Sequence, residues 1–143
     1  MHRFVSQRRS GGFTLIEILV VLAIVAMLAG LVGPRLWNQL GGAKTSTAAV
    51  QIKDLEQGVE LFRLDVGRFP NNQEGLEALV TRPATANGWK GPYLRKGLPA
   101  DPWGNPYRYE YPSKRGGDFD IYSFGADNAP GGDGENADVG NWN

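Results

Sequence analysis

Residues 13–33 read FTLIEILVVLAIVAMLAGLVG, and this stretch decides how the rest of the chain is organised. It is apolar throughout except for Thr14 and one acid, Glu17. As a helix rising 1.5 Å per residue it is roughly 30 Å long, which matches the hydrocarbon core of a bilayer. A secretory signal peptide has a shorter apolar region that ends in a small-residue cleavage site, and none follows this run. The stretch is therefore predicted to be a membrane-spanning helix.

Charge is distributed unevenly along the chain, although the formal net charge of its 143 residues is zero. Arg3, Arg8 and Arg9 precede the apolar run, which predicts a cytoplasmic N-terminus and the bulk of the chain on the other side of the membrane. No Lys or Arg follows Arg115, so the C-terminal end is acidic. The sequence shows no cationic patch of the kind that binds nucleic acid.

The residue types present limit the chemistry that the chain can perform. There is no Cys, and the only His is His2. This excludes thiolate catalysis and disulfides, and it leaves almost nothing for a zinc site or for histidine-based acid–base catalysis. Roughly thirty residues are taken by the leader and the span, so the remainder suffices for one small domain.

A processing motif lies where the basic leader, residues 1–12, meets the span at Gly12 and Phe13. The run G-F-T-L-I-E resembles the signal of type IV pilins and of the pseudopilins of type II secretion, in which a prepilin peptidase cuts after the glycine and methylates the new N-terminal Phe. The resemblance implies cleavage between Gly12 and Phe13 and an N-methylated Phe13. Without it, the leader reads as the cytoplasmic tail of a single-span protein.

Glu17 is an acid inside an apolar span, where an unpartnered charge costs at least about 2.5 kcal/mol. One interpretation keeps it hydrated near the interface, one turn into the span. In the resembling family the corresponding Glu pairs with the free amino group of a neighbouring subunit's first residue, which balances charge and sets the filament register. The resemblance therefore assigns Phe13 and Glu17 to self-assembly.

Pro34 follows Gly30 and Gly33 and removes the helical hydrogen bond to the Gly30 carbonyl. The helix is expected to kink or open here, or the proline simply ends the span. The family carries a proline at this place and loosens the helix around it in assembled filaments, so the resemblance adds Pro34 to the assembly residues. Gly41 and Gly42 offer a second weak place.

An amphipathic helical pattern continues from Ala43. Apolar residues recur at spacings of three and four, with charged residues on other faces. They are Ile52, Leu55, Val59, Phe62 and Val66. The pattern predicts the soluble half of one long N-terminal helix, packed along a globular domain, and its repeat is too short for a coiled coil. Gly67 is expected to cap this helix, with Pro70 beyond it.

Shorter elements are expected after the long helix. Residues 68–83, RFPNNQEGLEALVTRP, resemble the family's signature at this place and predict a short helix over 74–80, with Leu76, Leu79 and Val80 facing inward. Residues 87–102 are dense in Gly and Pro and predict a loop whose aromatic residues anchor it to the core.

A small antiparallel sheet of two or three strands is predicted next. Its first strand carries alternating Tyr107, Tyr109 and Tyr111, and a turn at 114–117 leads to a partner strand over 119–124. The run from Asp101 to Tyr107 resembles the D-P-W-G-x-x-Y sequence of major pseudopilins of type II secretion, as distinct from type IV pilins. The resemblance implies the α+β type IV pilin-like fold, in which a long N-terminal helix packs on a small antiparallel sheet.

The C-terminal residues GADNAPGGDGENADVGNWN have little apolar content and many glycines, a composition typical of disorder. They also crowd hard oxygen donors into one loop, the ligands that Ca²⁺ prefers. The spacing of the acids is not that of an EF-hand. The residue types alone leave both interpretations open.

The same stretch is similar to the calcium loop of major pseudopilins, S-x-G-A-D followed by a Gly and acid run ending in D-x-G-N-W. By that resemblance Asp127 matches the first side-chain ligand, Phe124 donates its backbone carbonyl and Asp138 matches the last acid. Asn136 stands where many relatives have Asp, so Asp133 or Glu135 could substitute. The implied cofactor is Ca²⁺, which would pin the C-terminal loop as disulfides do elsewhere.

The resemblance implies the major structural subunit of a pseudopilus and not an enzyme. The subunit would be stored in the inner membrane through residues 13–33, with 34–143 as a periplasmic domain. It would polymerise with copies of itself into a periplasmic filament whose growth helps drive folded exoproteins through the outer membrane. Its partners would be minor pseudopilins, prepilin peptidase, the inner-membrane assembly platform and membrane lipid, and not nucleic acid.

Two alternative functions are weaker. A type IV pilin of a surface filament is disfavoured by the Asp101 to Tyr107 motif and by the absence of a C-terminal Cys pair. A membrane-anchored periplasmic enzyme is disfavoured because no His or Cys remains after cleavage and no nucleophile and base converge in the sequence.

Overall fold

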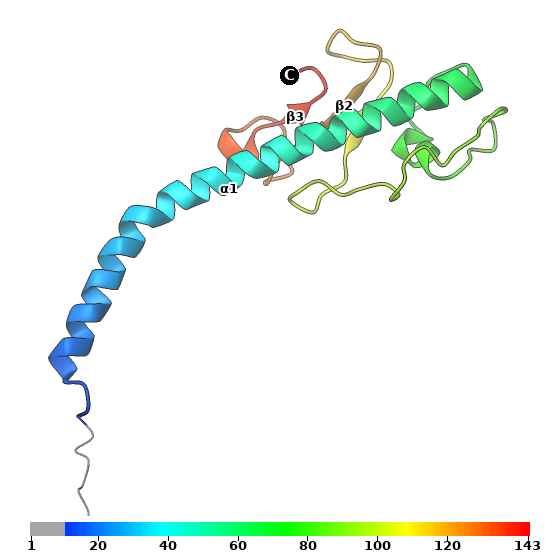
Figure 1. The fold of residues 1–143 in the computed structure, drawn as a ribbon. Helices are drawn as coiled ribbons and strands as arrows, with labels where there is room; N and C mark the ends of the chain where they lie inside the picture. Colours follow the sequence, from blue (N-terminus) through cyan, green and yellow to red (C-terminus); the bar gives the residue numbers. More distant parts are fainter. Residues whose placement is uncertain (1–10) are drawn as a thin grey trace, which may run out of the picture. The chain divides into compact units, whose positions relative to one another are not determined.

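The computed structural model describes residues 11–143, so most of the predicted leader, residues 1–10, lies outside the described residues. The elements follow in the order α1 (Leu15–Val66), η1 (Gly75–Leu79), β1 (Arg108–Glu110), β2 (Asp120–Ser123), η2 (Gly134–Asn136) and β3 (Val139–Gly140), where η denotes a 3₁₀ helix. The chain divides into one part up to Asn38 and a second, Gln39–Asn143, and each is described by itself. Figure 1 shows the course of α1 and the small sheet beside its second half.

The long N-terminal helix predicted from the sequence is confirmed as a single element of 52 residues. Pro34 lies inside it without ending it, and Gly41 and Gly42 are helical as well. The predicted cap at Gly67 is also confirmed. Gly67 has a φ of 85°, and its N–H donates to the Arg63 carbonyl at 2.7 Å. Glycine adopts this left-handed cap without strain.

The core of the second part lies along the predicted apolar stripe of α1. Ile52, Leu55, Val59 and Phe62 are at most 1% exposed, while Val66 is only half-buried at the end of the helix. Side chains from η1 and from the inner face of the sheet close this core against α1. They are Leu76, Ala78, Leu79, Phe119, Ile121 and Val139.

The sheet has three antiparallel strands in the order β1-β2-β3. Tyr122 on β2 lies opposite Arg108 on β1 and opposite Gly140 on β3. Because side chains alternate along a strand, Ile121 points to the core and Tyr122 to the outer face. The predicted partner strand and the third strand are thereby confirmed.

Two details of the sequence-based prediction are wrong. The segment after α1 is a 3₁₀ helix over Gly75–Leu79, in which Ala78 is buried and Val80 is only half-buried. With three residues per turn, Leu76 and Leu79 share the inner face and Val80 falls outside it. Tyr111 lies beyond the end of β1 and is 37% exposed, so the predicted tyrosine alternation stops at Tyr109.

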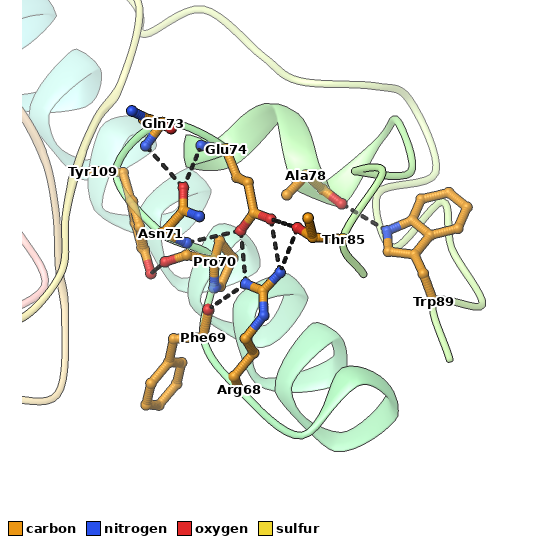
Figure 2. Close-up of polar contacts among 10 residues, drawn as sticks. All are labelled: Arg68, Phe69, Pro70, Asn71, Gln73, Glu74, Ala78, Thr85, Trp89 and Tyr109. Atoms are coloured by element: carbon orange, nitrogen blue, oxygen red, sulfur yellow. Dashed lines mark hydrogen bonds and ion pairs between the residues drawn. The ribbon is translucent and has the colours of Figure 1, made fainter. Parts of the chain in front are cut away.

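The connection between α1 and η1 is held by a polar network around Glu74 (Figure 2). The Arg68 guanidinium donates two hydrogen bonds of 2.7 Å to the Glu74 carboxylate. The Asn71 N–H donates to the same carboxylate at 2.9 Å and the Thr85 hydroxyl at 3.0 Å. The hydrogen bonds from Arg68, more than any other contact, lower the pKa of Glu74 to about 2.

The loop after η1 is anchored by its aromatic residues, as predicted. Trp89 Nε1 donates to the Ala78 carbonyl at 2.8 Å, as Figure 2 also shows. The Tyr93 hydroxyl donates to Asp65 on α1 at 2.9 Å. Both rings pack against the core, so these aromatic residues serve the fold.

Candidate assembly segment and acidic loop

The predicted cleavage site lies just before the helix begins. Gly12 and Phe13 have no regular secondary structure, and the Phe13 side chain is 81% exposed. Exposed backbone outside regular secondary structure is the form of chain that a peptidase can bind.

Thr14 and Glu17 form a capping box at the start of α1. The Thr14 N–H donates to Glu17 Oε2 at 3.4 Å, and the Glu17 N–H donates to Thr14 Oγ1 at 3.3 Å. These two bonds serve N–H groups that a helix start otherwise leaves unpaired. Glu17 therefore has a structural partner within its own chain.

The first part of α1 exposes an apolar surface all round. Exposed fractions of its large apolar residues run from 46% at Val32 to 80% at Leu15. This helix is long and apolar enough to cross a membrane, and its most apolar window is not buried by any described residue. Such a surface is the one that a bilayer, or the helices of other copies, would cover.

Gly41 is buried because the C-terminal loop approaches α1 there. A Cβ at Gly41 would lie 2.6 Å from Cγ of Glu135, whereas the neighbouring Gly42 has open space. The Glu135 carboxylate lies 4.0 Å from the Lys44 ammonium. Gly41, read from the sequence as a weak place in the helix, thus has a packing role.

The acidic loop from Gly125 to Asp138 is folded, held mainly by its own backbone. The Ala126 N–H donates to the Glu135 carbonyl at 2.8 Å, and the Gly131 N–H donates to both Asp138 oxygens at 3.1 Å. A Cβ at Gly125 would lie 2.5 Å from the Glu135 carbonyl oxygen and 2.9 Å from that of Ala137. Gly125 is therefore required by this close backbone approach.

The candidate calcium ligands are not gathered into one cluster of acids. Asp127, Asp133 and Asn136 are exposed, and Asp138 is half-buried. Within residues 11–143 no three acid, His or Cys side chains are placed to hold a metal ion. The carboxylate and carbonyl oxygens of the loop are nevertheless the ligand types that Ca²⁺ prefers, so the residues present fit the ion. Because the acids are not clustered, backbone carbonyl oxygens would have to complete a calcium site.

Asp101 of the D-P-W-G run connects that motif to the start of the acidic loop. It is 4% exposed, and its carboxylate accepts N–H groups of Trp103 at 3.1 Å and Asn105 at 2.7 Å. The Ser123 hydroxyl donates to the other Asp101 oxygen and itself accepts the Gly125 N–H at 3.0 Å. This buried bond fixes where the acidic loop leaves β2.

Sequence reasoning missed the roles of these connecting residues. The Thr-x-x-Glu spacing of the capping box was a readable signal for Thr14. Asp101 with Ser123 and Gly41 with Glu135 are pairs distant in sequence, and no local pattern marks them.

Comparison with protein families finds two matches. Residues 35–142 match the family described as type II secretion system protein G, and residues 7–33 match the prokaryotic N-terminal methylation motif.

Known relatives agree along nearly the whole chain. It is 46% identical over 141 residues to the type II secretion system core protein G of Pseudomonas aeruginosa, covering 95% of this chain and 97% of the relative. Its identity to the core protein G of Vibrio cholerae is 41% over 139 residues, covering 95% and 94%. The crystal structure of the major pseudopilin from the type 2 secretion system of enterohaemorrhagic Escherichia coli has a TM-score of 0.65 and 33% identity, covering 76% of this chain and 95% of that one. The predicted fold class is confirmed.

Proposed function

The chain belongs to the type II secretion system protein G family, and from this premise we propose that it is the major structural subunit of a secretion pseudopilus. The proposal rests mainly on one observation: both parts of the chain, the apolar helix and the folded domain, match families of this secretion system or its processing signal. The methylation motif covers the start of the apolar helix, and the protein G family covers the folded domain that follows. The family is one of structural pseudopilins and not of enzymes. A separate type IV pilin function has no such support.

Processing follows from the methylation motif. A prepilin peptidase removes residues 1–12 by cutting between Gly12 and Phe13, and Phe13 becomes N-methylated. The exposed, non-helical backbone before Leu15 supports this position for the cut.

The processed chain is anchored in the inner membrane by residues 13–33. Arg3, Arg8 and Arg9 of the leader favour a cytoplasmic N-terminus, which leaves residues 34–143 in the periplasm. The exposed apolar surface of this part of α1 supports the anchor.

Assembly transfers this helix from lipid into a homopolymer. Glu17 of one copy pairs with the Phe13 amino group of another, and the helix loosens near Pro34. Minor pseudopilins and the inner-membrane platform start and drive the polymer, whose growth helps move folded exoproteins through the outer membrane.

Calcium binding to the C-terminal loop is the second element of the proposal. Asp127 and Asp138 provide carboxylates, Phe124 a backbone carbonyl, and Asp133 and Asn136 further oxygens. When bound, the ion would neutralise acids that otherwise repel one another, and so couple its binding to the folding of the loop.

N-terminal sequencing of the chain expressed with and without a prepilin peptidase tests the function. We expect a chain beginning with N-methyl-Phe13 only when the peptidase is present, and no cut in Gly12→Val. Gly11→Ala is the matched control and should be cut normally. An uncut natural chain, or a cut after Ala29, would contradict the proposal.

A further inference from the structure

The outer face of the sheet carries a row of three aromatic rings. Tyr122 lies at its centre, with ring centroids 5.2 Å from Phe124 and 5.5 Å from Trp142. Trp142 is held over Gly140, where a Cβ would lie 2.4 Å from the indole ring. Gly140 is the cross-strand neighbour of Tyr122, so the indole fills the place of the missing side chain.

Two exposed arginines stack on this row. The Arg115 guanidinium carbon lies 3.7 Å from the Trp142 ring centroid, and that of Arg108 lies 4.5 Å from the Phe124 centroid. Across residues 11–143, neither guanidinium has an acid within 4.0 Å. A guanidinium stacked on a ring keeps its N–H edge available for a carboxylate. We call Arg108, Arg115, Tyr122, Phe124 and Trp142 the arginine–aromatic face.

This face is arranged before any partner arrives. Stacking fixes both long side chains, which removes much of the entropy loss that exposed arginines suffer when they bind. Arg115 belongs to the turn between β1 and β2, and Arg108 to β1 itself. The face therefore presents two cations on a rigid sheet.

Negative charge that complements the two arginines is present in the acidic loop of the same chain. The acidic loop carries four acids and no Lys or Arg, so it stays negative even with one divalent cation bound. Asp133 is exposed, and in the described part of the chain its carboxylate makes no ion pair or hydrogen bond. The loop meets α1 at Gly41 and Lys44. Tyr111, which starts the basic turn, is instead bonded to Asn72 beyond the other end of the helix.

We infer that the arginine–aromatic face of one copy binds the acidic loop of a second copy, with Arg115 of the first beside Asp133 of the second. Arg115 lies in the turn before β2, whereas the acidic loop begins after the other end of β2, so these two groups are kept apart within one chain and can make a head-to-tail contact between copies. Such a contact repeats from copy to copy and leads to a filament instead of a closed dimer. The inference rests on the proposed function, because it requires that the chain polymerises.

Cross-linking between copies tests the contact directly. The chain has no Cys, so Arg115→Cys in one copy and Asp133→Cys in another provide unique thiols for a short bismaleimide. Both variants are expressed together with the peptidase and the secretion machinery, and cross-linked dimers are measured in recovered filaments. We expect dimers for this pair and at least about fivefold fewer when Arg82→Cys replaces Arg115→Cys, since Arg82 is an exposed arginine outside the face.

A charge reversal provides the second readout. Arg115→Asp should lower the recovered filament fraction about fivefold, while Arg82→Asp should change little. Filaments that form normally from Arg115→Asp, without cross-links between 115 and 133, would overturn the contact and leave the proposed function standing. A natural chain that forms no filament would overturn both.

Discussion

Replacing Glu74 by Gln is expected to destabilise the folded domain by about 2 kcal/mol at neutral pH. Glu74 is only 10% exposed, and its carboxylate accepts two hydrogen bonds from Arg68 and one each from Asn71 and Thr85. A Gln side chain has the same shape but no charge. The Gln side chain replaces one carboxylate oxygen, which accepts a hydrogen bond from Arg68, with an NH₂ group that can only donate. The Arg68 guanidinium therefore keeps one of its two hydrogen bonds to this side chain.

The magnitude follows from the acidity of Glu74. The Arg68 hydrogen bonds lower the pKa of Glu74 to about 2, which corresponds to about 3 kcal/mol relative to an ordinary Glu. Water reduces this to about 2 kcal/mol, because the Arg68 side chain is 37% exposed. The pKa is lower in the folded state than in the unfolded state. The stabilisation is therefore complete above about pH 5 and is lost as the pH falls toward 2.

Thermal unfolding of the full chain in detergent, followed by near-ultraviolet circular dichroism, measures this effect. At pH 7 the Glu74→Gln melting temperature should lie about 8 °C below that of the natural chain, and the gap should narrow at pH 2.5. Glu77→Gln, in the 3₁₀ helix that follows Glu74, is the matched control. Because Glu77 is exposed, this change should alter stability by less than about 0.5 kcal/mol. Equal melting at pH 7, or a gap that does not depend on pH, would refute the reasoning.

Three further changes test other contacts. Gly41→Leu should lower the free energy of unfolding by about 1 kcal/mol, because the Glu135 side chain must move away and leave Lys44, whereas Gly42→Leu should not. Equal melting of the two variants would count against the close approach. Chelation with EDTA should lower the melting temperature and speed hydrogen exchange over residues 124–142, and Asp127→Asn should remove the response to Ca²⁺. An unchanged melting temperature with and without EDTA would argue against calcium binding by this loop. Glu17→Gln should retain the helix start but abolish filament formation, while Thr14→Ser, which keeps the capping hydroxyl, should retain both the helix start and filament formation. Normal filaments from Glu17→Gln would show that the charge is dispensable.

The parts of the fold that could be predicted are those written in local periodicity. The stripe from Ile52 to Phe62 repeats at helical spacing, so its burial follows from the sequence. The strand over Asp120–Ser123 was marked by its apolar residues and by the turn before it. Gly67 could be recognised as a cap because a proline soon follows it.

The remaining contacts join residues that no local pattern relates. Glu135 contacts Gly41, although the two residues lie near opposite ends of the domain's sequence. Ser123 at the end of β2 donates a hydrogen bond to Asp101, which precedes β1. Together with the loop's own backbone hydrogen bonds, these two contacts hold the acidic loop, whose Gly-rich composition by itself is typical of disorder. Composition indicates whether a segment folds in isolation. It does not reveal the contacts that the surrounding domain provides.

Under the proposed function, Glu17 would serve two states of the same chain. From the sequence, the acid in the apolar span either stays hydrated near the interface or needs a partner, and the family resemblance implies that this partner is the amino group of another copy. The structure gives it one within its own chain, through the bonds with Thr14. Those bonds are long, at 3.3 and 3.4 Å, and a charge-assisted bond to an ammonium is stronger than a bond to a neutral N–H. The capping box can therefore satisfy Glu17 while the subunit waits in the membrane, and it can be exchanged for the stronger pair once a neighbouring Phe13 amine arrives. Membrane storage and polymerisation would then differ in the partner of one carboxylate, and the helix start would be preserved in both.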